Sequence, residues 1–528
     1  MPWPNFFSSA PHPFHAERPP RIPKKDRIDV LLVYPIWVMK AGRGTLQRML
    51  PPLGVLSIAS NLEKHGYEVH VIDLHAEELN PDQFREAVRT LKPRFLGITV
   101  WTPHFIPAHH IAAIAKAEVP DIRVIAGGSH AEIAPEQMLQ NPAIDAVCRG
   151  DGEDVMLEYV RGKANKDVLG LSYLDGDRVV HNPPRGVSMD LDSYPFPAYH
   201  LIDLDLYFPP VSSYRDLPAI NLLMTRGCPG KCTFCNSANT TLRSRSPEKM
   251  VELLSILRNQ HGIRQGYFYD DTFTANPRMV REFCRLMLEK KVDMKWMCYI
   301  RGDMFTEPLA ELMAKAGCHQ VLIGVESGSK TLMAKIGKPI QKEKYIKTVE
   351  TAHKFGIEVR ASFIIGHLAE THETMVETVE FAKEMDAEFF QLSKMVPYPG
   401  TALFLEVKER GLLLHEDYSR FGPSELVMKL DTLTADEVIA FEKRAFFMFY
   451  MRPVALWRQI RRLSNWNQFK DLFKAARIIL LDGISAFSRD TRDLERWLDY
   501  DLKAVSNPKV TLPVDRLTYV VREGAEMH

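Results

Sequence analysis

Hydrophobic residues along the chain gather into two separate series of short runs, and each run is followed by a stretch with helical spacing. In the first series the runs DVLLVYP, EVHVID, RFLGITV, RVIAGG and AIDAVCRG are almost continuously apolar. Strands that are buried on both faces have this pattern, whereas strands with one wet face alternate between apolar and polar residues. The first series therefore predicts a doubly wound, Rossmann-like α/β domain with a parallel sheet, which we place at residues 28–160.

The second series occupies residues 218–401. Its candidate strands are INLLMT, GYFYDD, KWMCYI, QVLIGVES, VRASFIIG and FFQLSKMV, again separated by helical patterns. Six βα repeats predict a partial (β/α)6 barrel, whose chemistry lies at the carboxyl ends of the strands. Between the two series, residues 161–217 contain a hairpin-like stretch and the proline-rich segment LDSYPFPAYHL. We interpret them as a hairpin and a linker, because proline removes backbone donors and interrupts helices.

The two ends of the chain follow other patterns. Residues 1–27 mix prolines and aromatics without an uninterrupted apolar run, which predicts a flexible leader and not a signal peptide. Residues 402–528 are mainly helical by pattern and combine aromatic residues with many Arg and Lys side chains. We favour a helical cap on the barrel with a solvated basic face. Peripheral contact of these basic aromatic helices with an anionic membrane is the alternative.

Composition narrows the class of protein. A chain of 528 residues is too long for one core, and 45% hydrophobic with 25% charged residues is ordinary for globular domains. The net charge of zero gives no general attraction to nucleic acid, so no nucleic-acid partner is expected. Seven cysteines in so long a chain do not make a disulfide scaffold. A cytoplasmic location is therefore expected.

The most informative segment is TRGCPGKCTFCNS, in which Cys228, Cys232 and Cys235 follow the first barrel strand with C-x3-C-x2-C spacing. Thiolates are soft ligands for iron-sulfur clusters, zinc or copper. A structural zinc site needs a fourth ligand nearby, and none follows at a suitable distance. Three thiolates on a [4Fe-4S] cluster leave one iron open to bind another molecule. The remaining four cysteines lie on predicted strands or helices, as small buried apolar residues do.

This motif, with the aromatic Phe234 just before the last cysteine, resembles the radical S-adenosylmethionine (SAM) superfamily. The resemblance implies that the open iron of the cluster chelates SAM and that a reduced cluster cleaves it to a 5′-deoxyadenosyl radical. The three cysteines would then be the metal ligands and the catalytic centre, with Phe234 beside the cofactors. It also implies an external reductant such as flavodoxin or ferredoxin.

Other strand ends resemble the same family. Asp270 sits where the family often contacts the SAM amino group, although the usual glycine-glycine-glutamate is absent. Arg301 is similar to the arginine that pairs with the SAM carboxylate, a task that suits a forked guanidinium. Glu326 and Ser327 resemble the polar contact to ribose and methionine. The runs IGHLAET and PYPGT resemble the ends of the fifth and sixth strands.

In the first domain, PPLGVLSIASNLEKHGYEVHVIDL follows the first strand and AGGSHAEIAPEQML follows the fourth. With these segments the domain resembles the cobalamin-binding domain of the B12-dependent class of radical SAM proteins. The combination with LDSYPFPAYHL and RGDGE is similar to the branch that includes anaerobic magnesium-protoporphyrin ester cyclase and methylases of phosphorus or carbon. The resemblance implies cofactor contacts from Gly127, Gly128 and Ser129, after the fourth strand, and from Gly150 in the RGDGE turn. Glycines there would let the backbone approach a corrin or its nucleotide tail. Because the D-x-H-x-x-G loop is missing, no histidine ligand from that motif is expected.

Taken together, the resemblances imply a cobalamin-dependent radical SAM methyltransferase. It would methylate an unactivated carbon of a larger substrate, and this substrate is expected to be a small molecule and not a macromolecule. Two alternatives remain at this point. One is an oxidative cyclase of the porphyrin-ester type, without net methyl transfer. The other is a non-catalytic carrier of a corrinoid or an iron-sulfur cluster.

Overall fold

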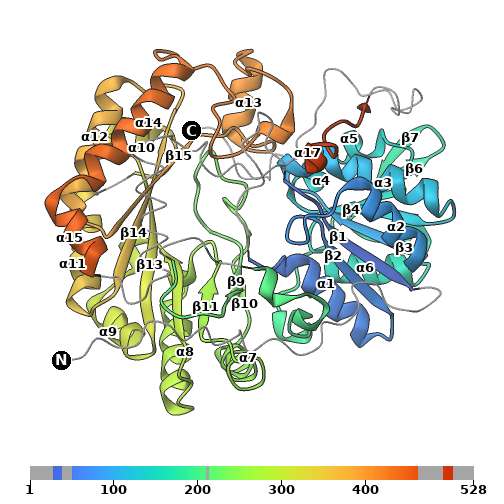
Figure 1. The fold of residues 1–528 in the computed structure, drawn as a ribbon, viewed down its shortest axis with the longest axis horizontal. Coiled ribbons are helices and arrows are strands. Elements are labelled where there is room, and N and C mark those ends of the chain that lie inside the picture. Colours follow the sequence, from blue (N-terminus) through green and yellow to red (C-terminus); the bar gives the residue numbers. More distant parts are fainter. Residues whose placement is uncertain are drawn as a thin grey trace.

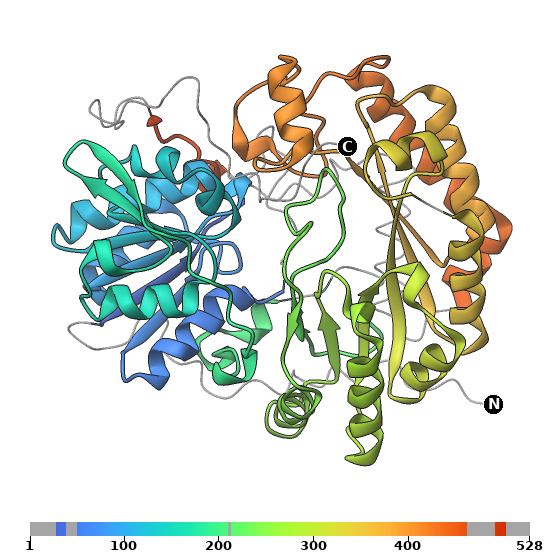
Figure 2. The same cartoon turned by 180° about the vertical axis from the view of Figure 1, so that it is seen from behind.

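The computed structural model describes residues 28–37, 50–207, 209, 213–339, 341–461 and 492–502. Two α/β units lie side by side, and a set of helices covers the second unit at its C-terminal end (Figure 1). The view from behind shows the same two units with the pair β9–β10 between them (Figure 2). The predicted leader, residues 1–27, and residues 462–491 of the basic C-terminal region lie outside the described residues.

The N-terminal unit is built on a seven-stranded sheet with the order β2-β1-β3-β4-β5-β6-β7. Its strands are β1 (Val30–Tyr34), β2 (Val69–Asp73), β3 (Phe95–Thr99), β4 (Arg123–Gly127), β5 (Ala146–Cys148), β6 (Leu171–Asp175) and β7 (Arg178–His181). Its helices are α1 (Leu53–Lys64), α2 (Pro81–Leu91), α3 (Phe105–Glu118), α4 (Ser129–Ile133), α5 (Pro135–Leu139) and α6 (Gly152–Val160). The first five strands are parallel, so the predicted doubly wound fold is confirmed.

Alternate residues of β1 enter two different cores. Val30 and Leu32 pack into the core that contains the inner faces of α1 and α6, whereas Leu31 and Val33 pack with α2 and α3. This double burial is the reason for the continuous apolar runs in the sequence. The hairpin β6–β7 joins the same sheet, because β5 pairs with β6 in antiparallel fashion.

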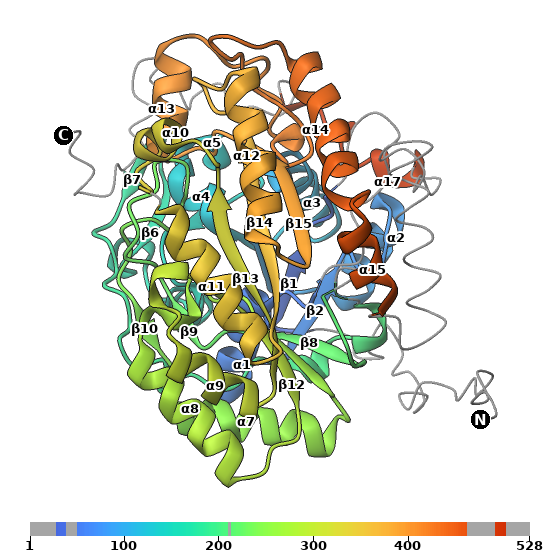
Figure 3. The ribbon, with the colours of Figure 1, turned by 90° about the vertical axis from the view of Figure 1, so that its left-hand side faces the viewer.

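The second unit is an open barrel of six parallel strands in the order β15-β14-β13-β12-β11-β8, as predicted. These strands are β8 (Ala219–Leu222), β11 (Gln265–Phe268), β12 (Lys295–Ile300), β13 (Cys318–Glu326), β14 (Glu358–Ile365) and β15 (Phe389–Lys394). The outer helices are α7 (Pro247–Gln260), α8 (Pro277–Glu289), α9 (Glu307–Lys315), α10 (Lys330–Lys335), α11 (Lys342–Lys354) and α12 (His372–Met385). They cover the outer face of the strands (Figure 3).

The C-terminal helices pack against both units. They are α13 (Ala402–Glu409), α14 (Ala435–Tyr450), α15 (Pro453–Arg461) and α17 (Arg492–Glu495). Helix α14 packs on β15 and α12, as expected for a cap, whereas α17 lies against the N-terminal unit (Figure 1). There Trp497 is fully buried and donates from Nε1 to the Leu79 carbonyl at 2.8 Å. Within the described ranges we find no helix with the length and apolar character that crossing a bilayer requires.

Candidate functional site

The three motif cysteines lie on one loop that leaves and rejoins the barrel through a small two-stranded sheet. Strand β9 (Thr225–Arg226) pairs in antiparallel fashion with β10 (Arg243–Ser244) and closes the loop at its base. Gly227 follows β9 with φ at 89°, and a Cβ there would overlap the Thr241 carbonyl. Only glycine fits this position, so the turn that aims the first cysteine is fixed by the backbone.

The thiols are partly buried and lie close enough to affect one another. Burial raises the pKa of Cys235 to about 11, and the thiols of Cys232 and Cys228 add to the rise. Burial also raises the pKa of Cys232, to which the charges of Glu326 and Cys228 add. The Gly230 amide donates to Cys228 Sγ at 3.4 Å. Within the described part of the chain, no three His, Cys, Asp or Glu side chains form a group that could hold a single metal ion.

Two cations stand beside this loop. Lys338 and Arg301 act against the burial that raises the pKa of Cys232, because each favours the thiolate. Soft thiolates next to cations suit an anionic iron-sulfur cluster. The residues present therefore fit the cluster that the motif predicts.

Glu326 ends β13 in an unusual conformation. Its φ is 68°, and the register between β13 and β14 shifts between Gly324 and Glu326. Its carboxylate accepts a 2.6 Å hydrogen bond from Lys338 Nζ, which also donates to the Gly324 carbonyl at 2.8 Å. Burial alone would lower the pKa of Lys338, but the Glu326 charge raises it above its usual value. A strained backbone that holds a buried ion pair near the cluster loop is typical of a functional position.

Arg301 lies at the carboxyl end of β12 and forms a two-pronged pair with Asp303, at 3.1 and 3.0 Å. A Cβ on Gly230 of the cluster loop would lie 3.9 Å from Arg301 Nη1. The guanidinium is therefore next to the cluster loop, where the SAM carboxylate was predicted. That contact stays a prediction.

Asp270 and Ser327 point into the protein and not toward the thiols. The Asp270 carboxylate is fully buried and accepts hydrogen bonds from the backbone amides of Met224, at 3.3 Å, and Thr225. Burial raises its pKa to about 6. Ser327 Oγ lies 3.1 Å from Thr378 Oγ1 and accepts from a backbone amide. Both residues shape the strand ends, and their predicted contacts with SAM stay untested predictions.

The neighbours of Asp270 face the loop instead. The charge of Asp271 adds to the burial that raises the pKa of Cys235, and Thr272 Oγ1 lies 3.9 Å from Cys228 Sγ. Phe234 is partly buried and packs against the barrel core. The sequence analysis assigned the contact with the SAM amino group to Asp270, whereas the carboxylate that acts on Cys235 belongs to the next residue, Asp271.

A cavity of about 320 Å³ opens at the carboxyl edge of the N-terminal sheet. Its deep wall is apolar and comes from β1, β3, β4, β5 and α1, and the predicted residues Gly127, Gly128 and Gly150 line it. A Cβ on Gly97, also in this wall, would lie 2.6 Å from Leu32 Cδ2, so a larger residue there would displace the Leu32 side chain. An apolar cavity of this size can hold a flat heterocycle such as the nucleotide base of cobalamin. Ser129, the fourth predicted residue, begins α4 just after Gly128.

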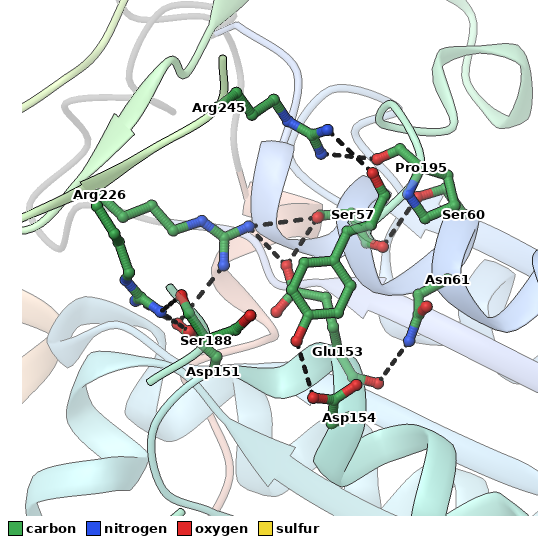
Figure 4. Close-up of polar contacts among 12 residues, drawn as sticks. Ser57, Ser60, Asn61, Asp151, Glu153, Asp154, Ser188, Pro195, Arg226 and Arg245 are labelled. Carbon is green, nitrogen blue, oxygen red and sulfur yellow. Dashed lines mark hydrogen bonds and ion pairs between the residues drawn. The ribbon is translucent and has the colours of Figure 1, made fainter. Parts of the chain in front are cut away.

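The outer wall of the cavity is polar and is shared with the barrel (Figure 4). Arg226 of β9 reaches Glu153 and Ser57 of the N-terminal unit, at 2.6 and 3.3 Å. Arg245, just after β10, donates to the carbonyls of Tyr194 and Pro195 at 2.9 and 2.8 Å. The cavity therefore lies between the N-terminal sheet and the base of the cluster loop.

Comparison with known proteins matches both units to family models. The model described as "Radical SAM superfamily" covers residues 222–382, and that described as "B12 binding domain" covers residues 39–160. A Pyrococcus horikoshii protein described as an uncharacterized methyltransferase is 35% identical over 418 residues, which are 78% of this chain and 90% of that protein. The chain belongs to the radical SAM superfamily. Within it, the chain is one of the proteins with an N-terminal B12-binding domain.

Further relatives and solved structures are similar to this chain. An anaerobic magnesium-protoporphyrin IX monomethyl ester cyclase from Rubrivivax gelatinosus is 29% identical over 88% of this chain and 84% of its own length. The cobalamin-dependent radical SAM enzyme OxsB superposes with a TM-score of 0.66 at 18% identity, over 85% of this chain and 71% of OxsB. The methyltransferase TsrM from Kitasatospora setae gives 0.59 at 20% identity, over 73% and 75%. These two structures share the fold of this radical SAM protein.

Several site residues were missed from the sequence. Lys338 lies 12 residues after its partner Glu326, and Arg226 lies 73 residues after Glu153, so no local spacing links either pair. The sequence offers one signal for Lys338. This lysine follows the short helix α10, which comes directly after the strand that ends at Glu326.

Proposed function

We propose that this radical SAM protein is a cobalamin-dependent methyltransferase that acts on an unactivated carbon. The observation that supports this proposal most directly is the position of Arg226. This residue lies at the base of the three-cysteine loop and also lines the cavity of the B12-binding domain. Both cofactors would then sit at facing edges of the two units. The methyltransferase names of several relatives support this proposal, including a cytidylyl-2-hydroxyethylphosphonate methyltransferase from Streptomyces wedmorensis at 28% identity.

Each cofactor has a set of residues to hold it in this proposal. Cys228, Cys232 and Cys235 would bind the cluster, and Arg301 with the Glu326–Lys338 pair would hold SAM at the open iron. Gly127 and Gly128 would admit the nucleotide end of cobalamin into the cavity. When bound, the cluster supplies the electron that cleaves SAM, and the corrinoid supplies the methyl group. The protein orients the two and excludes water.

The substrate is proposed to lie on the inner face of the barrel. Tyr299, Leu322, Arg360 and Phe389 are successive register partners across β12 to β15. Arg301 follows the end of β12, two residues beyond Tyr299, and is therefore about 7 Å further along the strand direction. A substrate against this row would lie one layer below the proposed SAM site.

The side chains of this row suggest what it would bind. Tyr269, just after β11, is 39% exposed, and its ring lies tilted against that of Tyr299 with centroids 5.5 Å apart. Burial raises the pKa of both tyrosines, and the charge of Arg360 offsets part of the rise. Tyrosine rings with a guanidinium suit a substrate that has an apolar body and an anionic group.

Three further expectations belong to this proposal. The reductant is a flavodoxin or ferredoxin, and the protein works in the cytoplasm. Peripheral contact with a membrane stays a prediction, and much of the segment concerned lies outside the described residues. In the described part, Phe447 and Trp457 of the α14–α15 surface are 50% and 59% exposed. Flotation with phosphatidylglycerol vesicles would test this contact.

The test of the main proposal is anaerobic reconstitution with iron, sulfide and hydroxocobalamin, followed by reduction with SAM present. We expect bound iron, sulfide and corrinoid, and release of 5′-deoxyadenosine. The Cys232→Ala variant should lose cluster and cleavage together but still bind corrinoid. A wild-type protein that releases no 5′-deoxyadenosine although it holds the cluster would contradict the radical assignment.

Labelled SAM separates methylation from the alternatives. With a methyl-labelled SAM, a methyltransferase places the label in its product, whereas an oxidative cyclase leaves the product unlabelled. A carrier without activity would show neither labelled product nor turnover of SAM.

A further inference from the structure

Both ends of the cluster loop are fastened to one acidic turn of the N-terminal unit (Figure 4). Arg226 of β9 donates from Nη2 to Glu153 Oε1 at 2.6 Å, and its Nη1 lies 3.5 Å from Asp151 Oδ1. Arg243, the register partner of Arg226 in β10, binds both carboxylate oxygens of Asp151. The segment that carries all three cysteines therefore begins and ends at the two carboxylates of the RGDGE turn.

The acidic side of this contact is buried and held by further hydrogen bonds. The Glu153 side chain is 3% exposed, and Ser57 Oγ donates to its Oε1 at 2.7 Å. Asn61 Nδ2 donates to the Glu153 backbone carbonyl at 3.0 Å, which holds the start of α6 against α1. Buried ion pairs often add little net stability, because the cost of desolvation offsets the attraction. Their fixed geometry is the property that such a contact contributes here.

The same residues touch both proposed cofactor sites. Asp151, Glu153 and Arg226 all line the cavity of the B12-binding domain. Only Gly227 separates Arg226 from Cys228, and Gly227 cannot carry a side chain in its turn. A movement of the acidic turn would therefore be passed to the first cysteine through two residues.

We propose that Asp151 and Glu153, with Arg226 and Arg243, form an interdomain brace that sets the distance between the corrinoid and the cluster. These four are positioning residues, since none is placed in contact with the reacting atoms. The proposal rests on the proposed function, because it requires both cofactors. A displacement of about 1 Å between reacting groups can cost about 100-fold in rate, so a brace of this kind would be needed for methyl transfer.

The test compares wild type with Glu153→Gln, which keeps the shape of the side chain and removes its charge. Both proteins are loaded with cluster and cob(II)alamin, and pulsed electron paramagnetic resonance measures the distance between the two spins. Wild type should give one narrow distance and Glu153→Gln a broader or shifted distribution. With saturating cobalamin and a chemical reductant, S-adenosylhomocysteine formation should fall about 10- to 100-fold, whereas the KM for SAM stays unchanged.

A matched control lies on the same helix. Glu158 of α6 pairs with Arg185, and both belong to the N-terminal unit, so Glu158→Gln should leave the spin distance and the rate at wild-type values. A merely structural role of Glu153 would lower thermal stability without changing the distance in the folded protein.

Arg226→Lys covers the case in which Glu153→Gln does not fold or load its cofactors. It keeps the charge but loses the fork that spans Glu153 and Asp151, and it should again broaden the distance. Wild-type distance and rate in the folded variants would overturn the brace. A wild-type protein that binds no cobalamin would instead refute the proposed function, so the two failures are distinguishable.

Discussion

A methyl group added at Gly127 would test where the corrinoid binds. Gly127 ends β4 in the wall of the cavity, and a Cβ there would meet Cys148 Cβ at 3.4 Å, an ordinary van der Waals contact. Gly127→Ala should therefore fold normally. Because glycine inside a strand costs about 0.5–1 kcal/mol relative to alanine, the cofactor-free variant should be as stable as wild type or slightly more stable.

Binding should change in the opposite direction. Extra carbon atoms in a closely packed space cost about 1–3 kcal/mol, and in a site filled by the cofactor this cost appears in the binding free energy. The Kd for cobalamin should rise by about 5- to 150-fold, with Gly127→Val at the upper end. A variant that is more stable than wild type without cobalamin, but binds cobalamin more weakly, is the result expected if the cofactor fills this cavity.

The assay is an anaerobic titration with hydroxocobalamin, followed by absorbance, together with thermal unfolding of the cofactor-free protein. Gly128→Ala serves as the contrast, because Gly128 has φ at 94° and ψ at 175° and a Cβ there would lie 3.0 Å from Val100 backbone atoms. That variant should unfold at a lower temperature, since such a conformation costs about 1–3 kcal/mol outside glycine. If Gly127→Val folds and binds cobalamin as tightly as wild type, the cofactor does not occupy this cavity.

Three further predictions concern stability. Burial raises the pKa of Glu370 to about 7. The group therefore stabilises the fold below pH 4, and about 3 kcal/mol of this stability is lost as the pH rises through 7. Glu370→Gln should flatten this dependence of the melting temperature on pH. Trp497→Ala should cost about 3–5 kcal/mol in denaturant unfolding, whereas exposed Trp457→Ala should stay within about 0.5 kcal/mol, and equal effects would contradict the docking of α17. Lys338→Met should cost about 3–5 kcal/mol by leaving the Glu326 carboxylate buried alone, and added Glu326→Gln should restore part of the melting temperature.

Much of the fold could be predicted because its signals are local. The five apolar runs of the N-terminal unit and the six of the barrel became parallel strands, since burial on both faces leaves its mark on every residue of a strand. The cysteine spacing was equally local, because three ligands within eight residues must share one loop. The hairpin β6–β7 was visible as a hairpin, but its pairing with β5 depends on a partner over 20 residues away.

Side-chain direction at strand ends was harder to predict. Asp270 and Asp271 are neighbours, and successive residues of an extended chain point to opposite sides. A shift of one residue therefore separates a carboxylate that holds the backbone of Thr225 from one that faces Cys235. Glu326 was placed correctly at a strand end, yet the shift in register that turns it toward Lys338 has no signature in the sequence.

The contacts that sequence patterns miss are those that join the two units. Periodicity reports which face of a strand or helix is buried, but not which carboxylate of one domain meets which arginine of the next. Arg226 follows a predicted strand and Glu153 ends the predicted RGDGE turn, and each residue taken alone suits its own element. Their pairing follows from the packing of two complete domains, so the geometry between two cofactors is a property of the tertiary structure and not of either motif.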